Sequence, residues 1–122
     1  MISIGSVKED LAVEKRVSIT PETAKKFKEL NFSVFLEKNY GEHLGIKDLE
    51  YQNNGATILS SAQEVLEKSE LILKVNFLKS NEANLIKNTS AVIGQFDVLL
   101  QKDAIDELIK KKIKVFSLNF LP

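Results

Sequence analysis

The sequence contains no cysteine, no tryptophan and a single histidine. The lack of cysteine excludes disulfides, thiolate catalysis and cysteine-ligated metal, and it is typical of proteins in a reducing compartment. No apolar run approaches the ~20 residues that span a bilayer, and the acidic pair Glu9-Asp10 stands where a signal peptide would continue its apolar segment. We therefore expect no direct membrane insertion, and a location on the cytoplasmic side of a membrane or the matrix side of an organelle.

The chain also has no excess of charge of either sign, because 17 basic residues balance 17 acidic ones. A chain with neither net charge nor a basic stripe offers no electrostatic attraction to nucleic acid or to an anionic membrane. The lysine run at 110–112 follows a helical pattern. We interpret it as a solvated helix end, where cations suit the helix dipole, and not as a binding patch.

Glycine is scarce, and none of the five glycines stands in a G-x-G-x-x-G or P-loop motif. Such motifs supply the backbone N–H groups that cradle nucleotide phosphates at a helix N-terminus. We therefore expect any nucleotide of the parent protein to be held mainly by sequence outside these residues. The lone His43 has no partner at metal-ligand spacing, so we expect an ordinary loop histidine, with a role in a site as the alternative, and no metal centre.

Short apolar segments alternate with longer amphipathic ones, as expected for a single domain of this length. The pattern predicts strands at 2–7, 32–36, 56–59, 71–75, 91–94 and 113–118. Helices are expected at 21–30, where Thr20-Pro21 marks the start, at 48–54, at 61–68, where Ser61 and Glu64 form a capping box, at 80–87 and at 104–112. The repetition predicts a doubly wound, mostly parallel α/β sheet of five to six strands, flavodoxin- or Rossmann-like, with helices on both faces. Because the sequence stops at Pro122 directly after a strand, we expect a truncated domain.

Arg16 and Lys74 are the candidate site residues. Arg16 lies in a polar segment between the first strand and the first helix, where parallel sheets build ligand sites. Lys74 interrupts an apolar strand near its carboxyl end, where a lysine must reach past the sheet edge or meet an anion. The spacing leaves a ligand pocket and ordinary surface pairing both open. Two adjacent cations repel, so we expect them to share an anion or to recruit an acid such as Glu9 or Glu14.

Several of these segments carry a family resemblance that covers essentially the whole chain. Lys8-Glu9, Glu14-Lys15-Arg16-Val17 and Thr20-Pro21-Glu22-Thr23 resemble the N-terminal signature of the alanine dehydrogenase and NAD(P) transhydrogenase α-subunit superfamily. The resemblance continues through 34–38, Tyr51 with Gly55-Ala56, 71–76 and 115–122. It implies that residues 1–122 are the N-terminal α/β domain of that type, without the Rossmann NAD-binding domain.

Within the superfamily, the sequence is most similar to the transhydrogenase α subunit. Alanine dehydrogenases carry a catalytic histidine after the strand that corresponds to 91–94, whereas this sequence places Asp97 there. Arg16 and Lys74 match the residues that hold pyruvate in alanine dehydrogenases, and they persist in transhydrogenases without that substrate. The resemblance therefore implies no catalytic residue in this chain, and a substrate or anion pocket at Arg16 and Lys74 at most.

The assembled enzyme is then expected to transfer hydride between NADH and NADP, coupled to proton translocation. Its implied partners are the remainder of the α subunit, a membrane β subunit and a second copy in a homodimer, which would place it peripherally at the inner membrane. NAD and NADP would belong to the full enzyme, and this chain alone would be inactive and hold neither tightly. The alternatives are the substrate domain of an alanine-dehydrogenase-like amino-acid dehydrogenase, with Arg16 and Lys74 on a 2-oxo acid, and a non-catalytic α/β assembly module.

Overall fold

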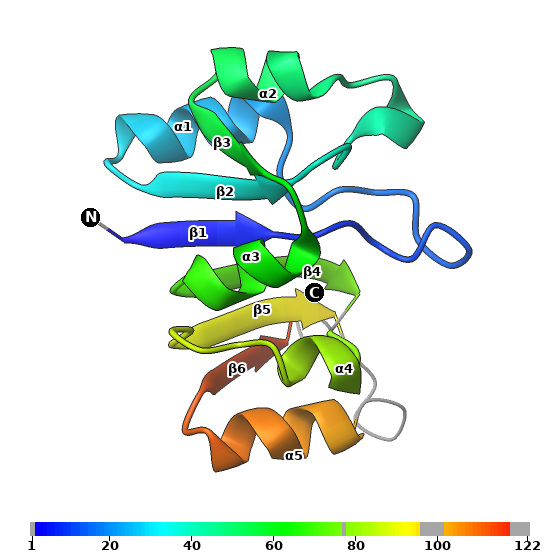
Figure 1. Cartoon of the computed structure of the whole chain (residues 1–122), viewed down its shortest axis with the longest axis vertical. Coiled ribbons are helices and arrows are strands. Elements are labelled where there is room, and N and C mark those ends of the chain that lie inside the picture. The colour runs from blue at the N-terminus through cyan, green and yellow to red at the C-terminus, as the bar shows by residue number, and fades with distance from the viewer. Residues whose placement is uncertain (1, 77, 96–101, 118–122) are drawn as a thin grey trace.

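The computed structural model describes residues 2–76, 78–95 and 102–117, in which strands and helices alternate along the chain (Figure 1). The strands are β1 (Ser3–Ser6), β2 (Ser33–Glu37), β3 (Ala56–Leu59), β4 (Leu71–Asn76), β5 (Ala91–Gln95) and β6 (Lys114–Ser117). The helices are α1 (Pro21–Glu29), α2 (Asp48–Asn53), α3 (Ala62–Lys68), α4 (Ser80–Ala83) and α5 (Lys102–Lys110), with a 3₁₀ turn at Glu42–Leu44. No helix in these ranges has the length and apolar character that a membrane span requires.

The strands form one six-stranded sheet in the order β3-β2-β1-β4-β5-β6, and every pairing is parallel. This is the strand order of doubly wound dinucleotide-binding folds, and it confirms the predicted α/β class. The order reverses between β1 and β4. In such sheets the crevice at the carboxyl ends of these two central strands is the usual place for a ligand site.

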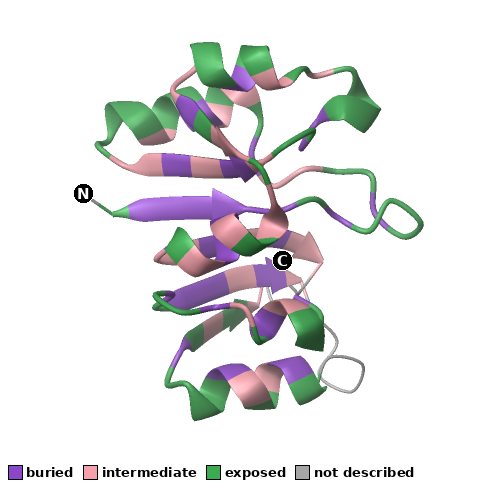
Figure 2. Ribbon diagram, viewed as in Figure 1, coloured by how far each residue is buried: buried purple, intermediate pink, exposed green. Residues whose placement is uncertain are grey.

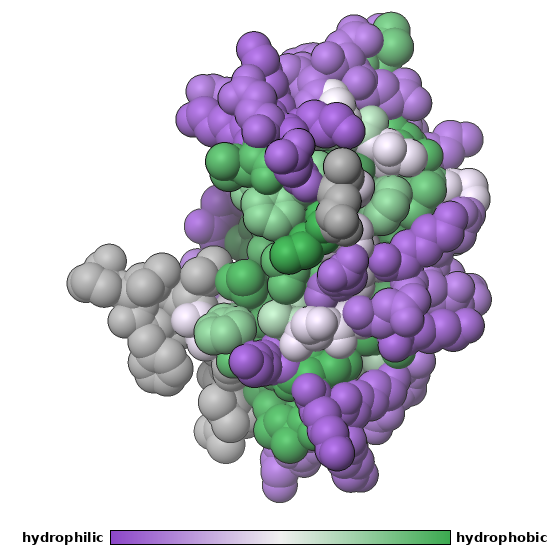
Figure 3. Space-filling model, turned by 90° about the vertical axis from the view of Figure 1, so that its left-hand side faces the viewer, coloured by the Kyte–Doolittle hydropathy of each residue, from purple (hydrophilic) through white to green (hydrophobic). Residues whose placement is uncertain are grey.

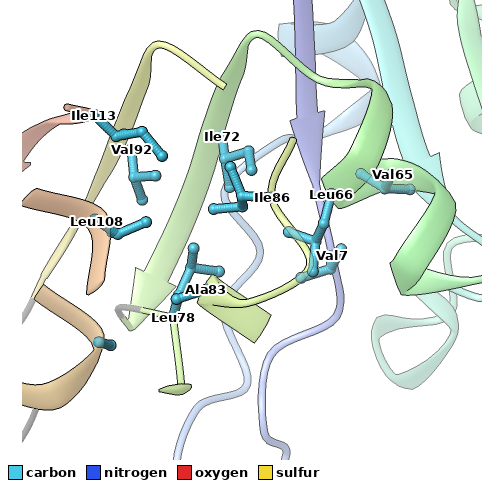
Figure 4. Packing of buried hydrophobic residues seen from close by; sticks show 11 residues of the cluster. Val7, Val65, Leu66, Ile72, Leu78, Ala83, Ile86, Val92, Leu108 and Ile113 are labelled. Atoms are coloured by element: carbon cyan, nitrogen blue, oxygen red, sulfur yellow. The ribbon is translucent and has the colours of Figure 1, made fainter. Parts of the chain in front are cut away.

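Two hydrophobic clusters lie on opposite faces of the sheet. Ile72 belongs to the cluster under α3, α4 and α5, whereas its neighbours Leu71 and Leu73 pack against the cluster under α1 and α2. Because successive strand residues point to opposite faces, helices cover both faces, as predicted. Figure 4 shows side chains of the first cluster converging from α3, the α4 region and α5 onto β4 and β5. In Figure 2 the central strand β1 is buried along its length, and the outer helix surfaces are exposed.

The predicted starts of α1 and α3 agree with the structure, whereas α5 begins at Lys102, two residues before the predicted start at 104. Thr20 caps α1 by accepting a hydrogen bond from the N–H of Thr23 at 3.1 Å, and Pro21 occupies the first helical position. Ser61 likewise caps α3 by accepting from the N–H of Glu64 at 3.2 Å. Only this half of the predicted capping box is seen, because the carboxylate of Glu64 accepts from the hydroxyl of Ser60, the residue before the cap.

The helix expected at 80–87 ends at Ala83, and this prediction is wrong in its length. The ammonium of Lys111 donates to the carbonyl oxygens of Ala83 at 3.1 Å and Ile86 at 3.3 Å, so these acceptors are satisfied by a side chain from α5's C-terminal end and not by a further helical turn. The interpretation of 110–112 as a purely solvated helix end is therefore corrected for Lys111, which holds α4 against α5.

The two ends of the sheet differ in character. Figure 3 shows the side at which the strands begin, where a band of hydrophobic residues runs between hydrophilic ones. The carboxyl ends of β1 and β4 lie at the other end of the strands, where the β1–α1 loop (residues 7–20) leaves the sheet (Figure 1). That loop is mostly exposed, yet it buries two acidic residues, Glu9 and Glu14.

Candidate anion site at the carboxyl ends of the central strands

The candidate site lies where β1 and β4 separate. The two strands pair at Ile4–Leu71 and Gly5–Ile72. One residue later, the hydroxyl of Ser6 donates to the carbonyl oxygen of Leu73 at 2.7 Å. Beyond Ser6 the chain enters the β1–α1 loop, so the remainder of β4 takes its partners on this side from loop side chains.

Lys74 meets a carboxylate from this loop. Its ammonium lies 3.4 Å from Oε1 of Glu9 and donates to the carbonyl oxygen of Lys8 at 3.1 Å. The side chains of Lys74 and Glu9 are 5% and 0% exposed. A buried ammonium without a partner costs several kcal/mol, so the pairing with Glu9 explains how an apolar strand tolerates a lysine.

Arg16 has a separate acidic partner. Its guanidinium donates from Nε and Nη2 to the two carboxylate oxygens of Glu14, each at 2.9 Å, and its backbone N–H adds a third bond at 3.0 Å. These bonds from Arg16 lower the pKa of Glu14 to about 2. The Arg16 side chain is 66% exposed, so its outer face stays open to an approaching anion.

Two cavities border these ion pairs. Arg16 and Lys74 line one of about 390 Å³, together with residues of β4 and β5. A larger one of about 860 Å³ is lined by Lys74 as well, and by Lys8, Glu9 and Lys79 among others. The structure thus brings the two predicted cations to one cavity, but each already holds a protein carboxylate. Binding of an external ligand there stays a prediction.

Tyr40, which holds the β1–α1 loop, was missed by sequence reasoning. The hydroxyl of the buried Tyr40 accepts from the N–H groups of Ser18 at 3.0 Å and Ile19 at 3.3 Å, and it lies 2.8 Å from the Ser6 hydroxyl. Because the Ser6 hydroxyl already donates its proton to the carbonyl oxygen of Leu73, the Tyr40 hydroxyl is the donor in its contact with Ser6. Burial raises the pKa of Tyr40 to about 12. No local pattern marks this tyrosine, since its partners come from β1 and from the loop.

His43, expected to be an ordinary loop histidine, also contacts the β1–α1 loop. It is exposed, and its Nε2 lies 2.7 Å from the carbonyl oxygen of Lys15, next to Arg16. A carbonyl accepts only, so Nε2 carries the proton in this contact. Among the described residues no group of three acids or histidines is arranged to hold a metal ion. Asp97, the position expected to replace a catalytic histidine, lies outside the described residues.

The chain matches known proteins over nearly its full length. The first segment of the NAD(P) transhydrogenase subunit alpha of Rickettsia prowazekii is 30% identical over 125 residues, covering 99% of this chain and 33% of that protein. The alanine dehydrogenase of Methanococcus maripaludis is 34% identical over 110 residues, covering 90% of this chain and 30% of that protein. The crystal structure of transhydrogenase from Sinorhizobium meliloti has a TM-score of 0.87 at 28% identity, over 98% of this chain and 36% of that one.

These relatives are much longer proteins, and the chain spans about a third of the length of the curated relatives it matches. The family described as alanine dehydrogenase/PNT, N-terminal domain, matches residues 5–122. The strands β2 to β6, the second half of β1 and the loop that carries Arg16 all fall within that match. The chain therefore belongs to the alanine dehydrogenase/PNT N-terminal domain family.

Proposed function

We propose that this chain serves as the N-terminal domain of an NAD(P) transhydrogenase α subunit, in an enzyme that transfers hydride between NADH and NADP and couples the transfer to proton translocation. The observation that carries the proposal is that relatives named as NAD(P) transhydrogenase alpha subunits match 99% of this chain. A membrane β subunit, a homodimer and a peripheral position on the cytoplasmic or matrix side belong to the same proposal.

The residues of this chain do not fit the pyrophosphate of a dinucleotide. In doubly wound folds the first strand-to-helix turn supplies glycines and free N–H groups to the phosphates. Here residues 7–20 contain no glycine, and the Glu9 side chain places a carboxylate in the crevice. The backbone N–H of Thr23, in the first turn of α1, already donates to the hydroxyl of Thr20. We therefore assign NAD binding to the remainder of the α subunit, with this domain as a wall of the cleft.

Isothermal calorimetry of the 122-residue chain with NADH tests this assignment. We expect weak binding or none, and no hydride transfer by the chain alone. The phosphates of NADH would be repelled by the Glu9 carboxylate at the place where other dinucleotide-binding folds supply N–H donors. Micromolar binding of NADH would contradict the assignment, since it would require a phosphate site within these residues.

A second candidate is the substrate domain of an alanine-dehydrogenase-like enzyme. It is favoured by the 34% identity to an alanine dehydrogenase and by the presence of Arg16 and Lys74 at one cavity, where they would hold a 2-oxo acid. A non-catalytic assembly module would use neither residue for a ligand.

The enzyme that contains this chain should be assayed with NADH plus NADP and with NADH plus pyruvate and ammonium. We expect the first reaction and not the second, because the family resemblance places Asp97 where alanine dehydrogenases carry a histidine, and an ionised aspartate does not protonate a carbonyl oxygen. Robust turnover of pyruvate would favour the second candidate, and absence of both activities would favour the assembly module.

A further inference from the structure

Two backbone N–H groups and one ammonium at the end of β4 converge on one carboxylate. The N–H of Val75 donates to Oε2 of Glu9 at 3.0 Å, and the N–H of Asn76 donates to Oε1 at 3.1 Å. The Lys74 ammonium lies 3.4 Å from Oε1. Both oxygens of a fully buried carboxylate are thus bound, one of them twice, by donors from a single stretch of strand.

The backbone of β4 is shaped for this acceptor. Consecutive N–H groups of a regular strand point in opposite directions, yet those of Val75 and Asn76 reach the same carboxylate. The register between β4 and β5 shifts between Leu73 and Asn76, an irregularity of the kind that turns neighbouring N–H groups to one side. Gly94 of β5 permits it, because a Cβ there would lie 2.7 Å from the carbonyl oxygen of Lys74.

The acceptor itself is not part of the sheet. Glu9 comes from the β1–α1 loop and reaches β4 through its side chain alone. Glu9, Lys74 and Asn76 also line the cavity of about 860 Å³, and the Glu9 carboxylate is fully buried behind this lining. Removal of the carboxylate would therefore open the two N–H groups and the ammonium toward a space that a small molecule can enter. The donors would remain in place on the strand if this one side chain were absent.

We propose that the N–H groups of Val75 and Asn76 and the ammonium of Lys74 form a binding site for a carboxylate, with Glu9 as its built-in ligand. A small monocarboxylate such as formate binds at this site when the Glu9 carboxylate is removed. Formate does not displace Glu9 from the wild-type chain, because a tethered ligand acts at a high effective concentration. The proposal rests on these contacts and is independent of the transhydrogenase assignment.

The test compares Glu9→Ala with the wild-type chain and with Asp10→Ala. Asp10 is the neighbouring acid on the same loop, but it pairs with the exposed Lys79 at 3.2 Å. Melting temperatures are measured in increasing sodium formate and in equal concentrations of sodium chloride. We expect Glu9→Ala to melt at a lower temperature and to be restored by formate in a saturable way, whereas formate and chloride act alike on the wild type and on Asp10→Ala.

Amide resonances give a second measurement at the site itself. In Glu9→Ala, formate should shift the N–H signals of Val75 and Asn76 with the same midpoint as the thermal rescue. If Glu9→Ala is unfolded in chloride, folding that requires formate supports the site. If Glu9→Ala fails to fold in both salts, the test uses Glu9→Ser, whose short polar side chain leaves the space of the carboxylate open to formate. No formate-specific effect on melting or on these two resonances in either variant would overturn the proposal.

Discussion

The hydroxyl oxygen of Tyr40 makes several of the hydrogen bonds that hold the β1–α1 loop in place. Its hydroxyl accepts from the N–H groups of Ser18 and Ile19 and donates to Ser6, which in turn donates to β4. The neighbouring Tyr51 makes a simpler contact, a single bond from its hydroxyl to the carbonyl oxygen of Ile19 at 2.8 Å. The two rings pack edge to face with centroids 5.6 Å apart.

Tyr40→Phe should therefore lower the free energy of unfolding more than Tyr51→Phe does. The first change leaves two backbone N–H groups without their acceptor in a buried or half-buried place, at a cost of about 2 kcal/mol, and the second removes one neutral bond worth about 1 kcal/mol. Urea unfolding followed by circular dichroism measures both. Equal losses would show that water replaces the Tyr40 hydroxyl at no cost.

The low pKa of Glu14 depends on Arg16, and Arg16→Ala should raise it. The guanidinium bonds are lost, but the backbone N–H of residue 16 still donates to the carboxylate, so the pKa should rise from about 2 only part of the way toward 4.5. Carboxyl carbon NMR titration measures this shift. Lys26→Ala, which removes the partner of the exposed Glu22, is the control that should leave Glu14 unchanged.

The sign of the pH effect follows from this pKa. A carboxylate whose pKa is lower in the folded state stabilises the fold at pH values above its ordinary pKa of 4.5. That contribution is lost as the pH falls through about 2. In Arg16→Ala the contribution should be smaller and its loss complete at a higher pH, because the pKa of Glu14 in the folded state is higher. An unchanged acid-unfolding profile would contradict the role of Arg16 in holding the loop.

At the scale of whole elements, α4 depends on a lysine from another helix. α4 spans Ser80–Ala83 and is too short to be stable from its own hydrogen bonds. Lys111, just after α5, donates to the carbonyl oxygens that end it, and the Ala83 side chain is fully buried between the elements. The two helices are thus held together by one cation and by shared apolar packing.

Lys111→Ala should destabilise the chain by about 1–2 kcal/mol, the range for a hydrogen-bonded charged donor that remains partly exposed. Lys110→Ala is the matched control, because Lys110 is the preceding lysine and is exposed at the last position of α5. Hydrogen exchange should also speed up at the amides of Asn84 to Ile86 in the first variant. If both variants exchange and unfold alike, the Lys111 contacts contribute nothing to stability.

The elements set by local signals could be predicted from the sequence. β3 coincides with the prediction because its apolar run directly follows Gly55, and the start of α3 coincides because Ser61 caps it. The end of α4 could not, since Lys111 lies 28 residues away from Ala83 in the sequence. At the site, a lysine in an apolar strand indicated an anion nearby. The bond pattern of Glu9 depends on the path of the loop at residues 7–20, which has no periodicity to interpret.

At the scale of the whole molecule, alkaline pH should destabilise the fold by ionising the two buried tyrosines. Burial raises the pKa of Tyr40 from 10.0 to about 12 and raises that of Tyr51 as well. A group whose pKa is higher in the folded state stabilises the fold below its ordinary pKa, and this contribution is lost as the pH rises through the folded value. We therefore expect the free energy of unfolding to fall between pH 10.0 and about 12.

The chain has no other tyrosine, so tyrosinate absorbance reports these two residues. Absorbance and far-ultraviolet circular dichroism should change together in one cooperative step, because ionisation of either ring requires the α1–α2 cluster to open. Tyrosinate formation near pH 10.0 with intact circular dichroism would mean that the rings are reached by solvent in the native state.

The short pairing between β1 and β4 also affects the order in which the chain folds during synthesis. Every buried member of the cluster under α1 and α2 lies between Ile4 and Ala56, and the strands β1, β2 and β3 are complete by Leu59. One half-sheet, with its own apolar core, therefore leaves the ribosome ahead of β4. The second half-sheet can then pair its strand β4 with the exposed edge of β1. Glu9 and Lys74, which come from the early and the late half of the polypeptide, would be among the last groups to form their contact.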